Sequence, residues 1–381
     1  MIGLIITGII AVSAFVVIPN LSYVNLLYTD QQQLRNIALD TLKAMLLEAG
    51  YPANWGTTYN FDPDQVERFG LALAESSSFY VLDPDKVQRL VVGNPAGFME
   101  YEDIHTELAL QGYGFNFRII PPFKVIVNDV DFDGESNPIT LANLTEGVDV
   151  LVTYNTGSPI PKASVEAILL YVLKGKDTFY TGIEAYNTTN ALGKCTMNPD
   201  VPDGITDFVL VFKVTVADVT TITSSYKEGF GEQHIMNASI VGENITLSIP
   251  EGPGWEKGSA GTRWVDNVIV VNKEGAWIIY NGTRSDEDKI TWGGENWIWS
   301  RLFSSLSYYN PLFIIVNLSV PNPRRLVLFL GPDPNWMGMR VEAFGDPTGS
   351  GGATSAVTVQ RDVIISEMTY IAELILWKES P

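Results

Sequence analysis

The sequence predicts a mainly β protein with one long N-terminal α-helix, whose strands form β-sandwich domains. Residues 1–27 are an uncharged apolar stretch, and a helical pattern of apolar residues continues from it to about Ala49. From Phe115 onward the chain consists largely of short alternating or continuous apolar runs between Gly, Pro and Asn turns. These two patterns together favour a helix followed by sheets.

The predicted helix has two parts. Residues 1–27 are long enough to cross a bilayer, because about 20 apolar residues at ~1.5 Å each span its hydrocarbon core. Pro19 predicts a kink, and Gly50 and Pro52 end the helix. The second part is amphipathic, with residues of one face recurring at intervals of three and four: Leu34, Ile37, Ala38, Thr41, Leu42, Met45 and Leu46.

This helix has three candidate roles: a cleaved signal peptide, a membrane anchor or the core of a filament. No Lys or Arg precedes Arg35, so the basic region of a signal peptide is missing. The amphipathic part favours the filament core over the anchor, because a helix that faces only lipid needs no such extension. Docking of the extension on the protein's own β domain is the alternative explanation.

Composition restricts the partners. The chain has 44 acidic and 24 basic side chains and a net charge of −20, which repels phosphate backbones and excludes nucleic acid as a partner. The single cysteine, Cys195, allows no internal disulfide and is expected to be a small buried side chain. Besides an implausible one at Asn20 inside the apolar region, N-x-S/T sequons predict N-linked glycans at Asn143, Asn187, Asn237, Asn244, Asn281 and Asn317.

The two ends of the chain resemble archaeal type IV pilin-like proteins, the group of archaeal pilins and archaellins. The resemblance rests on the two-part helix, the junction LLEAGYPANWG at residues 46–56 and a closing β-hairpin at residues 357–377. It implies a surface-filament subunit that is membrane-inserted before assembly, becomes extracellular and has copies of itself as partner, with no cofactor. The helix-assembly residues would be Gly3, Ile5, Gly8, Ile9, Val12, Phe15, Val16 and Pro19.

Precursors in that group carry a short basic leader before the apolar segment. The sequence shows no leader before Met1. Either the numbering begins at the mature end, or the helix is a plain anchor.

A central segment resembles the immunoglobulin-like, carboxypeptidase regulatory-like modules of surface proteins. Their pattern is G-x-P-x-x-x-A-x-V followed by T-x-x-x-G-x-A, and the matching residues are Gly157, Pro159, Ala163, Val165, Thr189 and Gly193. Cys195 stands where the small residue is usual. The resemblance implies a spacer or binding module inserted between strands of another sandwich.

Four domains are expected. Residues 1–50 form the helix, residues 51–123 form a mixed α/β segment packed on the C-terminal domain, residues 124–206 form the immunoglobulin-like module, and residues 207–381 form a β-sandwich. Short helices are expected at residues 85–92 and 102–109, and hairpin turns at residues 272–275 and 281–282. A last strand that returns to the Phe115 strand would close one sandwich around the inserted module.

One spacing suggests a metal. Residues 129–137, DVDFDGESN, begin like a calcium loop, with ligands at alternate positions before Gly134. Thr140 replaces the expected bidentate Glu, so an acidic turn is the alternative. The candidate calcium ligands are Asp129, Asp131, Asp133 and Asn137.

No catalytic site is predicted. His105 and His234 are far apart and lack the partners of a hydrolytic triad or a zinc site. Trp297 and Trp299 alternate on one sheet face, where a packed core is favoured over a sugar-stacking surface. The functions that remain are a filament subunit, a monomeric membrane-anchored binding protein and, as a remote alternative, an exported hydrolase.

Overall fold

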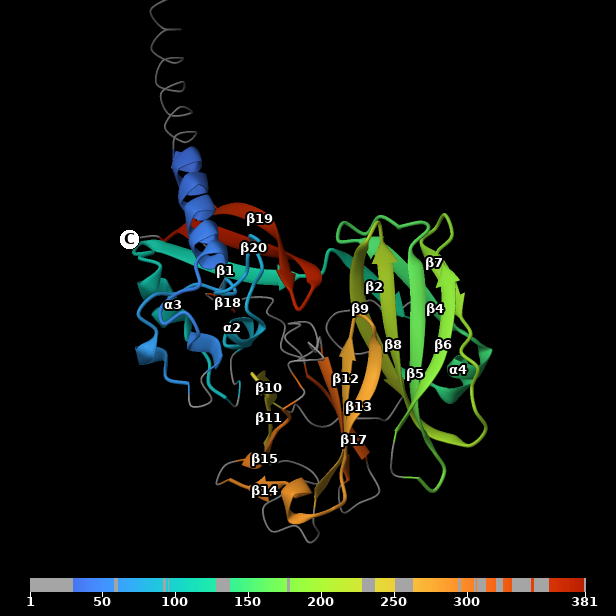
Figure 1. Ribbon diagram of the computed structural model, residues 1–381. Coiled ribbons are helices and arrows are strands. Elements are labelled where there is room, and N and C mark those ends of the chain that lie inside the picture. The colour runs from blue at the N-terminus through green and yellow to red at the C-terminus, as the bar shows by residue number, and fades with distance from the viewer. Residues whose placement is uncertain are drawn as a thin grey trace, which may run out of the picture.

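The computed structural model describes residues 30–57, 61–91, 94, 96–127, 138–176, 179–227, 237–250, 263–293, 296–304, 306, 313–319, 325–330, 344–345 and 356–379. Within them the protein is mostly β, arranged in five sheets whose strand pairs are antiparallel except for one. Figure 1 shows a helix and small helical elements at one end, and three groups of strands. The mainly β expectation is therefore confirmed.

The N-terminal part combines a helix with short helical elements. The helix covers residues 30–47 and ends next to Gly50, which has a φ of +74°. It is followed by η1 (Trp55–Thr57), η2 (Pro63–Gln65), α2 (Pro84–Gln88) and α3 (Tyr101–Glu107). The helices α2 and α3 confirm the two short helical patterns. Asp83 and Pro84 begin α2 because the Asp83 side chain accepts from the Asp85 N–H and Pro84 needs no partner there.

The first sheet pairs a strand that follows the N-terminal helical part with the last strands of the chain. Its order is β18 (Phe344–Gly345), β1 (Tyr113–Ile120), β20 (Met368–Lys378) and β19 (Ala356–Ile365). The pairing of β1 with β20 runs from Tyr113 opposite Lys378 to Ile120 opposite Ile371. The closing hairpin and the return of the last strand to the Phe115 strand are therefore confirmed. Buried residues of the N-terminal helix pack in one core with this sheet.

The second unit has two sheets around a shared core. One sheet is β2 (Phe123–Val127), β4 (Val148–Tyr154) and β7 (Lys194–Met197); the other is β3 (Pro138–Ile139), β9 (Val219–Lys227), β8 (Ile205–Val216), β5 (Ser164–Leu173) and β6 (Tyr180–Thr188), with α4 at Leu141–Glu146. The structure places the end of this unit beyond the predicted boundary at residue 206. That boundary falls within β8, which pairs with β5 from Ile205 to Thr215. Pairing between strands so distant in sequence has no local signal.

Two residues of the regulatory-like pattern, Thr189 and Gly193, contact neighbouring segments of this unit. The Thr189 hydroxyl is buried, accepts from the Ala163 N–H at 2.8 Å and donates to the Ile160 carbonyl at 2.8 Å. Gly193 has a φ of +72°, and a Cβ there would lie 2.6 Å from the Val152 carbonyl oxygen. A side chain with a hydroxyl at position 189 and a glycine at position 193 are therefore favoured on local grounds.

The third unit also has two sheets with a common core. They are β10 (Asn237–Val241), β11 (Asn244–Pro250), β15 (Asn296–Leu302) and β14 (Thr291–Trp292), and β13 (Gly275–Asn281), β12 (Trp264–Asn272), β16 (Phe313–Ser319) and β17 (Arg325–Leu330). The turn predicted at residues 272–275 joins β12 to β13 as a hairpin. The turn at residues 281–282 is no hairpin, because the chain leaves the sheet there for η3 (Asp286–Asp288).

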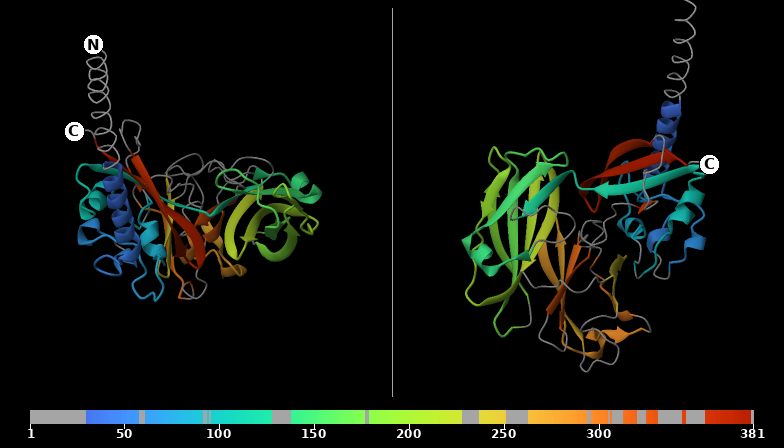
Figure 2. Two further views of the ribbon diagram at one scale, coloured as in Figure 1. Left: turned by 90° about the horizontal axis from the view of Figure 1, so that it is seen from above. Right: turned by 180° about the vertical axis from the view of Figure 1, so that it is seen from behind.

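The three units meet in a continuous core. The cluster under the N-terminal helix also contains residues of β5, β8 and β9, and of β12 and β16. Both views in Figure 2 show the helix-bearing part and the β2–β9 unit at opposite ends, with β12 and β13 between them. The predicted domain of residues 207–381 is thus divided among all three units: β8 and β9 belong to the second, and β19 and β20 to the first.

Candidate functional site

The N-terminal helix projects from the body. Its Asp30 end extends beyond β19 and β20, and its other end enters the body beside α2 (Figure 1). Residues 1–29, which include every predicted helix-assembly residue, lie outside the described part. Among the described residues, no helix combines the length and the apolar character that crossing a bilayer requires.

One face of this helix is buried against the protein's own body. The buried side chains recur at helical spacing and belong to the core shared with β1 and β20: Leu34, Ala38, Leu42, Met45 and Leu46. The opposite face is polar and exposed, and on it Lys43 pairs with Asp40 at 3.4 Å. The amphipathic extension is thus docked on its own domain. It no longer distinguishes a filament core from an anchor.

A cluster of charges surrounds α2. Lys86 and Arg89 are fully buried, and Asp83 is nearly so. Burial and the Asp83 carboxylate raise the pKa of Asp85 to about 7, although the Gly242 N–H and the two cations act the other way. Burial also lowers the pKa of Arg89 to about 10 and lowers that of Lys86, which the Asp83 carboxylate partly offsets.

The sequence interpretation missed this cluster. The capping pair Asp83 and Pro84 begins the helix, and Lys86 and Arg89 then lie three residues apart on one face. That local signal was available. Nothing local indicated that this face would be buried.

The predicted glycan acceptors differ in accessibility. Asn187 and Asn281 are exposed, and Asn143 and Asn244 are half-buried. Asn237 is the first residue of β10. Three of these acceptors lie on strands at the edge of a sheet: Asn187 on β6, Asn237 on β10 and Asn281 on β13.

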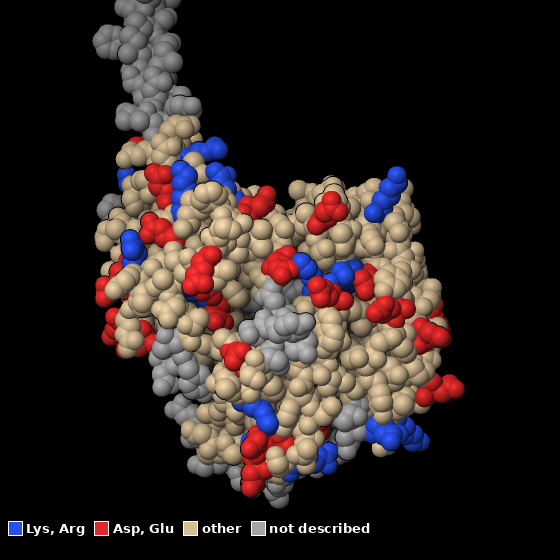
Figure 3. Space-filling view, in the orientation of Figure 1, with Lys and Arg blue, Asp and Glu red and all other residues tan. Residues whose placement is uncertain are grey.

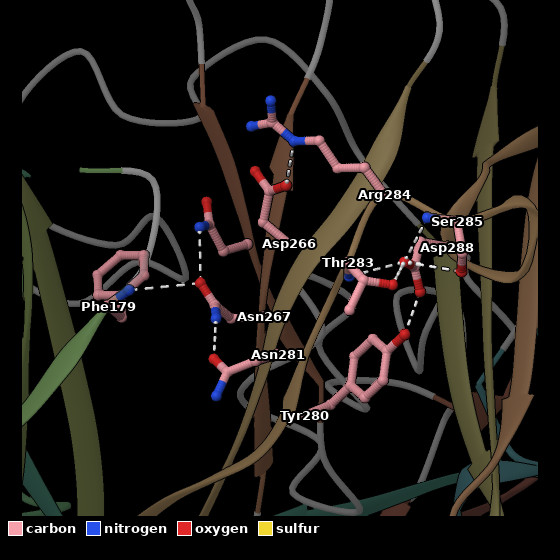
Figure 4. A network of polar contacts seen from close by, with 10 residues as sticks. Phe179, Asp266, Asn267, Tyr280, Asn281, Thr283, Arg284, Ser285 and Asp288 are labelled. Carbon is pink, nitrogen blue, oxygen red and sulfur yellow. Dashed lines mark hydrogen bonds and ion pairs between the residues drawn. The ribbon is translucent and has the colours of Figure 1, made fainter. Parts of the chain in front are cut away.

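Asn317 does not fit the prediction of a glycan. Its side chain is fully buried in β16, and its Nδ2 donates to Asn267 Oδ1 at 3.1 Å. The Asn267 Nδ2 donates in turn to Asn281 Oδ1 at 2.6 Å, and Asn267 Oδ1 also accepts from the Phe179 N–H at 3.3 Å (Figure 4). The prediction at Asn317 is therefore wrong for the folded chain, because the attachment nitrogen faces the sheet interior. Asn281 is the outermost residue of this series of amides, and it takes part in the series through its Oδ1 atom, which accepts from Asn267.

A second polar group orders the loop after β13 (Figure 4). The buried Asp288 carboxylate accepts from the Tyr280 hydroxyl, from the Thr283 and Ser285 N–H groups at 2.9 Å each, and from Arg301 at 3.3 Å. Burial alone raises the pKa of Asp288, but these hydrogen bonds outweigh it and hold the pKa below its usual range. The group is a closed structural network, since each donor is directed at the carboxylate.

The calcium prediction lies outside the described residues, which contain neither Asp129, Asp131, Asp133 nor Asn137. Within the part of the chain that is described, no cluster of three or more His, Cys, Asp or Glu residues could hold a metal ion.

The described side chains form no catalytic arrangement that we can identify. His105 Nε2 donates to the Tyr113 carbonyl oxygen at 2.8 Å, and His234 lies outside the described residues. Cys195 is half-buried, and burial with the nearby Asp149 carboxylate raises the pKa of its thiol to about 11. A thiol with so high a pKa is a poor nucleophile.

The predicted tryptophan face is a packed one. Trp299 is buried between the sheets of the third unit, and its Nε1 donates to the Glu287 carbonyl at 3.0 Å. Trp297 packs edge to face on Trp292 at 5.4 Å between ring centroids, and the Arg263 guanidinium lies 4.1 Å from its ring. The core interpretation of this face is therefore confirmed.

Charges of both signs are mixed on the face of the molecule that Figure 3 shows. Acidic side chains are scattered over this face, with Lys and Arg between them. No broad basic patch is visible there.

Comparisons with known proteins give little. No protein-family model matches the sequence, and no curated protein matches it either. Weak structural similarity extends to trypsin-activated alpha-2-macroglobulin from Escherichia coli, with 10% identity, TM-score 0.21 and coverage of 65% of this chain and 18% of that one. Salmonella alpha-2-macroglobulin reacted with methylamine gives 9% identity, TM-score 0.21 and coverage of 63% and 17%. The chain spans under a fifth of these proteins, and scores this low carry no argument about function.

Proposed function

We propose that this chain is a structural subunit of an archaeal, type IV pilus-like surface filament. It would insert in the membrane through its N-terminal helix, polymerise with copies of itself after extraction, and expose its β domains outside the cell. The observation that carries the proposal is the difference between two neighbouring segments of the chain. Residues 30–47 are docked on the body, whereas the uncharged residues 1–27 are attached at the end that projects from it.

Physical chemistry supports this distinction. Each large apolar side chain removed from water contributes about 1.5 to 3 kcal/mol as an upper bound, so residues 1–27 need lipid or each other. Gly3 and Gly8 would allow close helix approach. With no charge before Asp30, cohesion of such a bundle should be insensitive to salt.

The β domains would form the outer sheath. We propose that the β2–β9 unit is an immunoglobulin-like spacer or binding module, and that glycans on exposed acceptors such as Asn187 and Asn281 cover the surface. The net charge of −20 keeps such a sheath soluble through like-charge repulsion. A calcium ion at residues 129–137 stays part of the proposal, and calorimetry with calcium on the wild type and on Asp131→Ala tests it.

Electron microscopy of shear-released material from cells that express the full chain tests the filament. The wild type and Gln32→Glu, a change on the exposed helix face, should give regular filaments. Gly8→Glu should give none, because it places a charge in the apolar bundle, while the β domains keep their fold by circular dichroism. If the wild type is found only as membrane-bound monomers, the anchored binding protein replaces the filament subunit.

A further inference from the structure

We propose that α2 is a latch that transmits tension from the N-terminal helix into the β body, with the Lys86 ammonium as its main contact. The inference rests on the proposed filament function, because only a helix held in a polymer is pulled along its axis. It goes further by naming the contacts that bear this tension.

The first observation is how the helix ends. The last carbonyls of an α-helix have no partner within the helix and usually face water. Here the Met45 and Glu48 carbonyls accept from the Leu71 and Ala72 N–H groups, at 2.8 and 3.0 Å. The end of the helix is therefore joined to the body through its own main chain.

Lys86 adds a charged contact at the same place. Its ammonium donates to the Ala49 carbonyl and to the Ala72 carbonyl, each at 2.9 Å, and lies 3.6 Å from the Asp83 carboxylate. Two of the three ammonium donors thus bind main-chain carbonyls, and the Asp83 carboxylate compensates the charge as an ion pair. Because the side chain is fully buried, water cannot replace an acceptor that is pulled away.

Arg89 fixes α2 on its other flank. Its guanidinium donates to the Gly56 carbonyl at 3.0 Å from two nitrogens and to the Ala96 and Gly97 carbonyls, and it lies 4.8 Å from the centre of the Phe61 ring. The two cations thus bind main-chain carbonyls on several segments around α2. The five-residue helix α2 is thereby joined to these segments through side-chain contacts of Lys86 and of Arg89, the residue that follows it.

The far side of α2 reaches the third unit. Gln88 Oε1 accepts from the Ile240 N–H at 2.9 Å, and Asp85 Oδ2 accepts from the Gly242 N–H at 3.0 Å. Both acceptors belong to α2, and both donors belong to β10 or the turn after it. A continuous series of polar contacts therefore runs from the Ala49 carbonyl through α2 to the sheet of β10 and β11.

These contacts differ in kind from the apolar stripe of the helix. Apolar burial is non-directional, and its contribution depends on the area that stays buried rather than on the alignment of particular atoms. Hydrogen bonds depend on distance and angle, and those made by a charged group are about twice as strong as neutral ones. A pull on the Asp30 end thus meets directional contacts at the other end of the helix, where Lys86 lies.

The test compares Lys86→Met with Lys43→Met in the full chain. Methionine keeps the length of the lysine stem and removes the ammonium, and Lys43 is an exposed lysine on the helix itself. Hydrogen exchange in detergent-solubilised monomers reports detachment of residues 34–47, with the amides of β20 as an internal standard of folding. Lys86→Met should speed exchange in the helix at least tenfold, and Lys43→Met should leave it unchanged.

Filaments of each variant are then sheared and their lengths measured. Lys86→Met filaments should break to less than half the wild-type length, with Lys43→Met as the control. If exchange in the helix is unchanged, or if it rises but the filaments resist shear as the wild type does, the latch is refuted. If the wild type forms no filaments, the proposed function fails, while the exchange data alone still decide whether Lys86 holds the helix.

A second variant tests the proposal if the β20 amides of Lys86→Met also lose their protection against hydrogen exchange. Gln88→Met leaves the Lys86 contacts in place and removes the acceptor for the Ile240 N–H, together with the weaker bond from Gln88 Nε2 to the Pro84 carbonyl at 3.3 Å. Exchange in β10 and β11 should rise, exchange in the helix should stay as in the wild type, and the filaments should again shorten under shear. Wild-type filament length in this variant would refute the path through α2.

Discussion

Replacement of Thr189 by valine should destabilise the β2–β9 unit far more than replacement by serine. Valine has the shape of threonine but no hydroxyl, so it leaves the buried Ala163 N–H and Ile160 carbonyl, both now at 2.8 Å from Thr189 Oγ1, without a partner. Each buried polar group left unpaired costs about 1–3 kcal/mol. We expect Thr189→Val to lower the free energy of opening by about 3 kcal/mol.

Serine isolates the role of the hydroxyl. Thr189→Ser keeps both hydrogen bonds and removes one buried methyl group, which contributes about 0.8 kcal/mol. The expected difference between the two variants is therefore about 2 kcal/mol, in favour of serine. Volume loss alone predicts the opposite order.

The assay has to report on this unit alone. None of the nine tryptophans lies between residues 124 and 227, so tryptophan fluorescence follows the other units. Hydrogen exchange of the β5 and β8 amides gives the local free energy of opening, with β20 as the reference. A valine variant as protected as the serine variant would refute the assignment of Thr189 as the polar link between these loops.

Two further predictions concern charge and modification. Because the pKa of Asp85 is raised to about 7 from 3.8, its contribution to stability is complete below pH 4, is lost as pH rises to 7 and is constant above. One pKa unit corresponds to about 1.4 kcal/mol, and we halve the resulting free energy because the side chain is partly exposed. The stability of the wild type relative to Asp85→Asn should therefore fall by about 2 kcal/mol over that pH range. A difference in stability that does not change with pH in urea titrations would contradict this prediction. Glycopeptide mass spectrometry of protein from the source cells should find a glycan at the exposed Asn187 and none at the buried Asn317, and a glycan at Asn317 would contradict the packing of β16.

Local signals in the sequence were enough for most elements. Gly50 and Pro52 marked the end of the helix, and in the structure Asp83 and Pro84 begin α2 and the prolines at residues 121–122 lie between β1 and β2. Each of these rests on the backbone preference of one or two residues. Boundaries of this kind can be predicted because the cause lies within a few residues of the effect.

Contacts between residues that are distant in sequence could not be predicted from such local signals. The pairing of β8 with β5 moved the boundary at residue 206, and the burial of Lys86 depends on the Ala49 and Ala72 carbonyls. Asn317 is instructive, because its sequon suggested an exposed loop while the apolar run around it indicated a buried strand. The structure shows that the apolar run was the better guide.

The choice between a filament subunit and a plain anchor now depends on different residues. The sequence favoured a filament because of the amphipathic part of the helix, but residues 30–47 bury their apolar face on their own body, as an anchored monomer also could. What an anchor does not need is a polar clamp at the inner end of the helix, because a monomer in a membrane bears no steady pull along that axis. Under the proposed function, the buried ammonium of Lys86 at the Ala49 carbonyl would serve as that clamp. If Lys86→Met speeds exchange in the helix but leaves filament length under shear unchanged, this argument for a filament subunit fails. Micrographs of the wild type then decide between the subunit and the anchor.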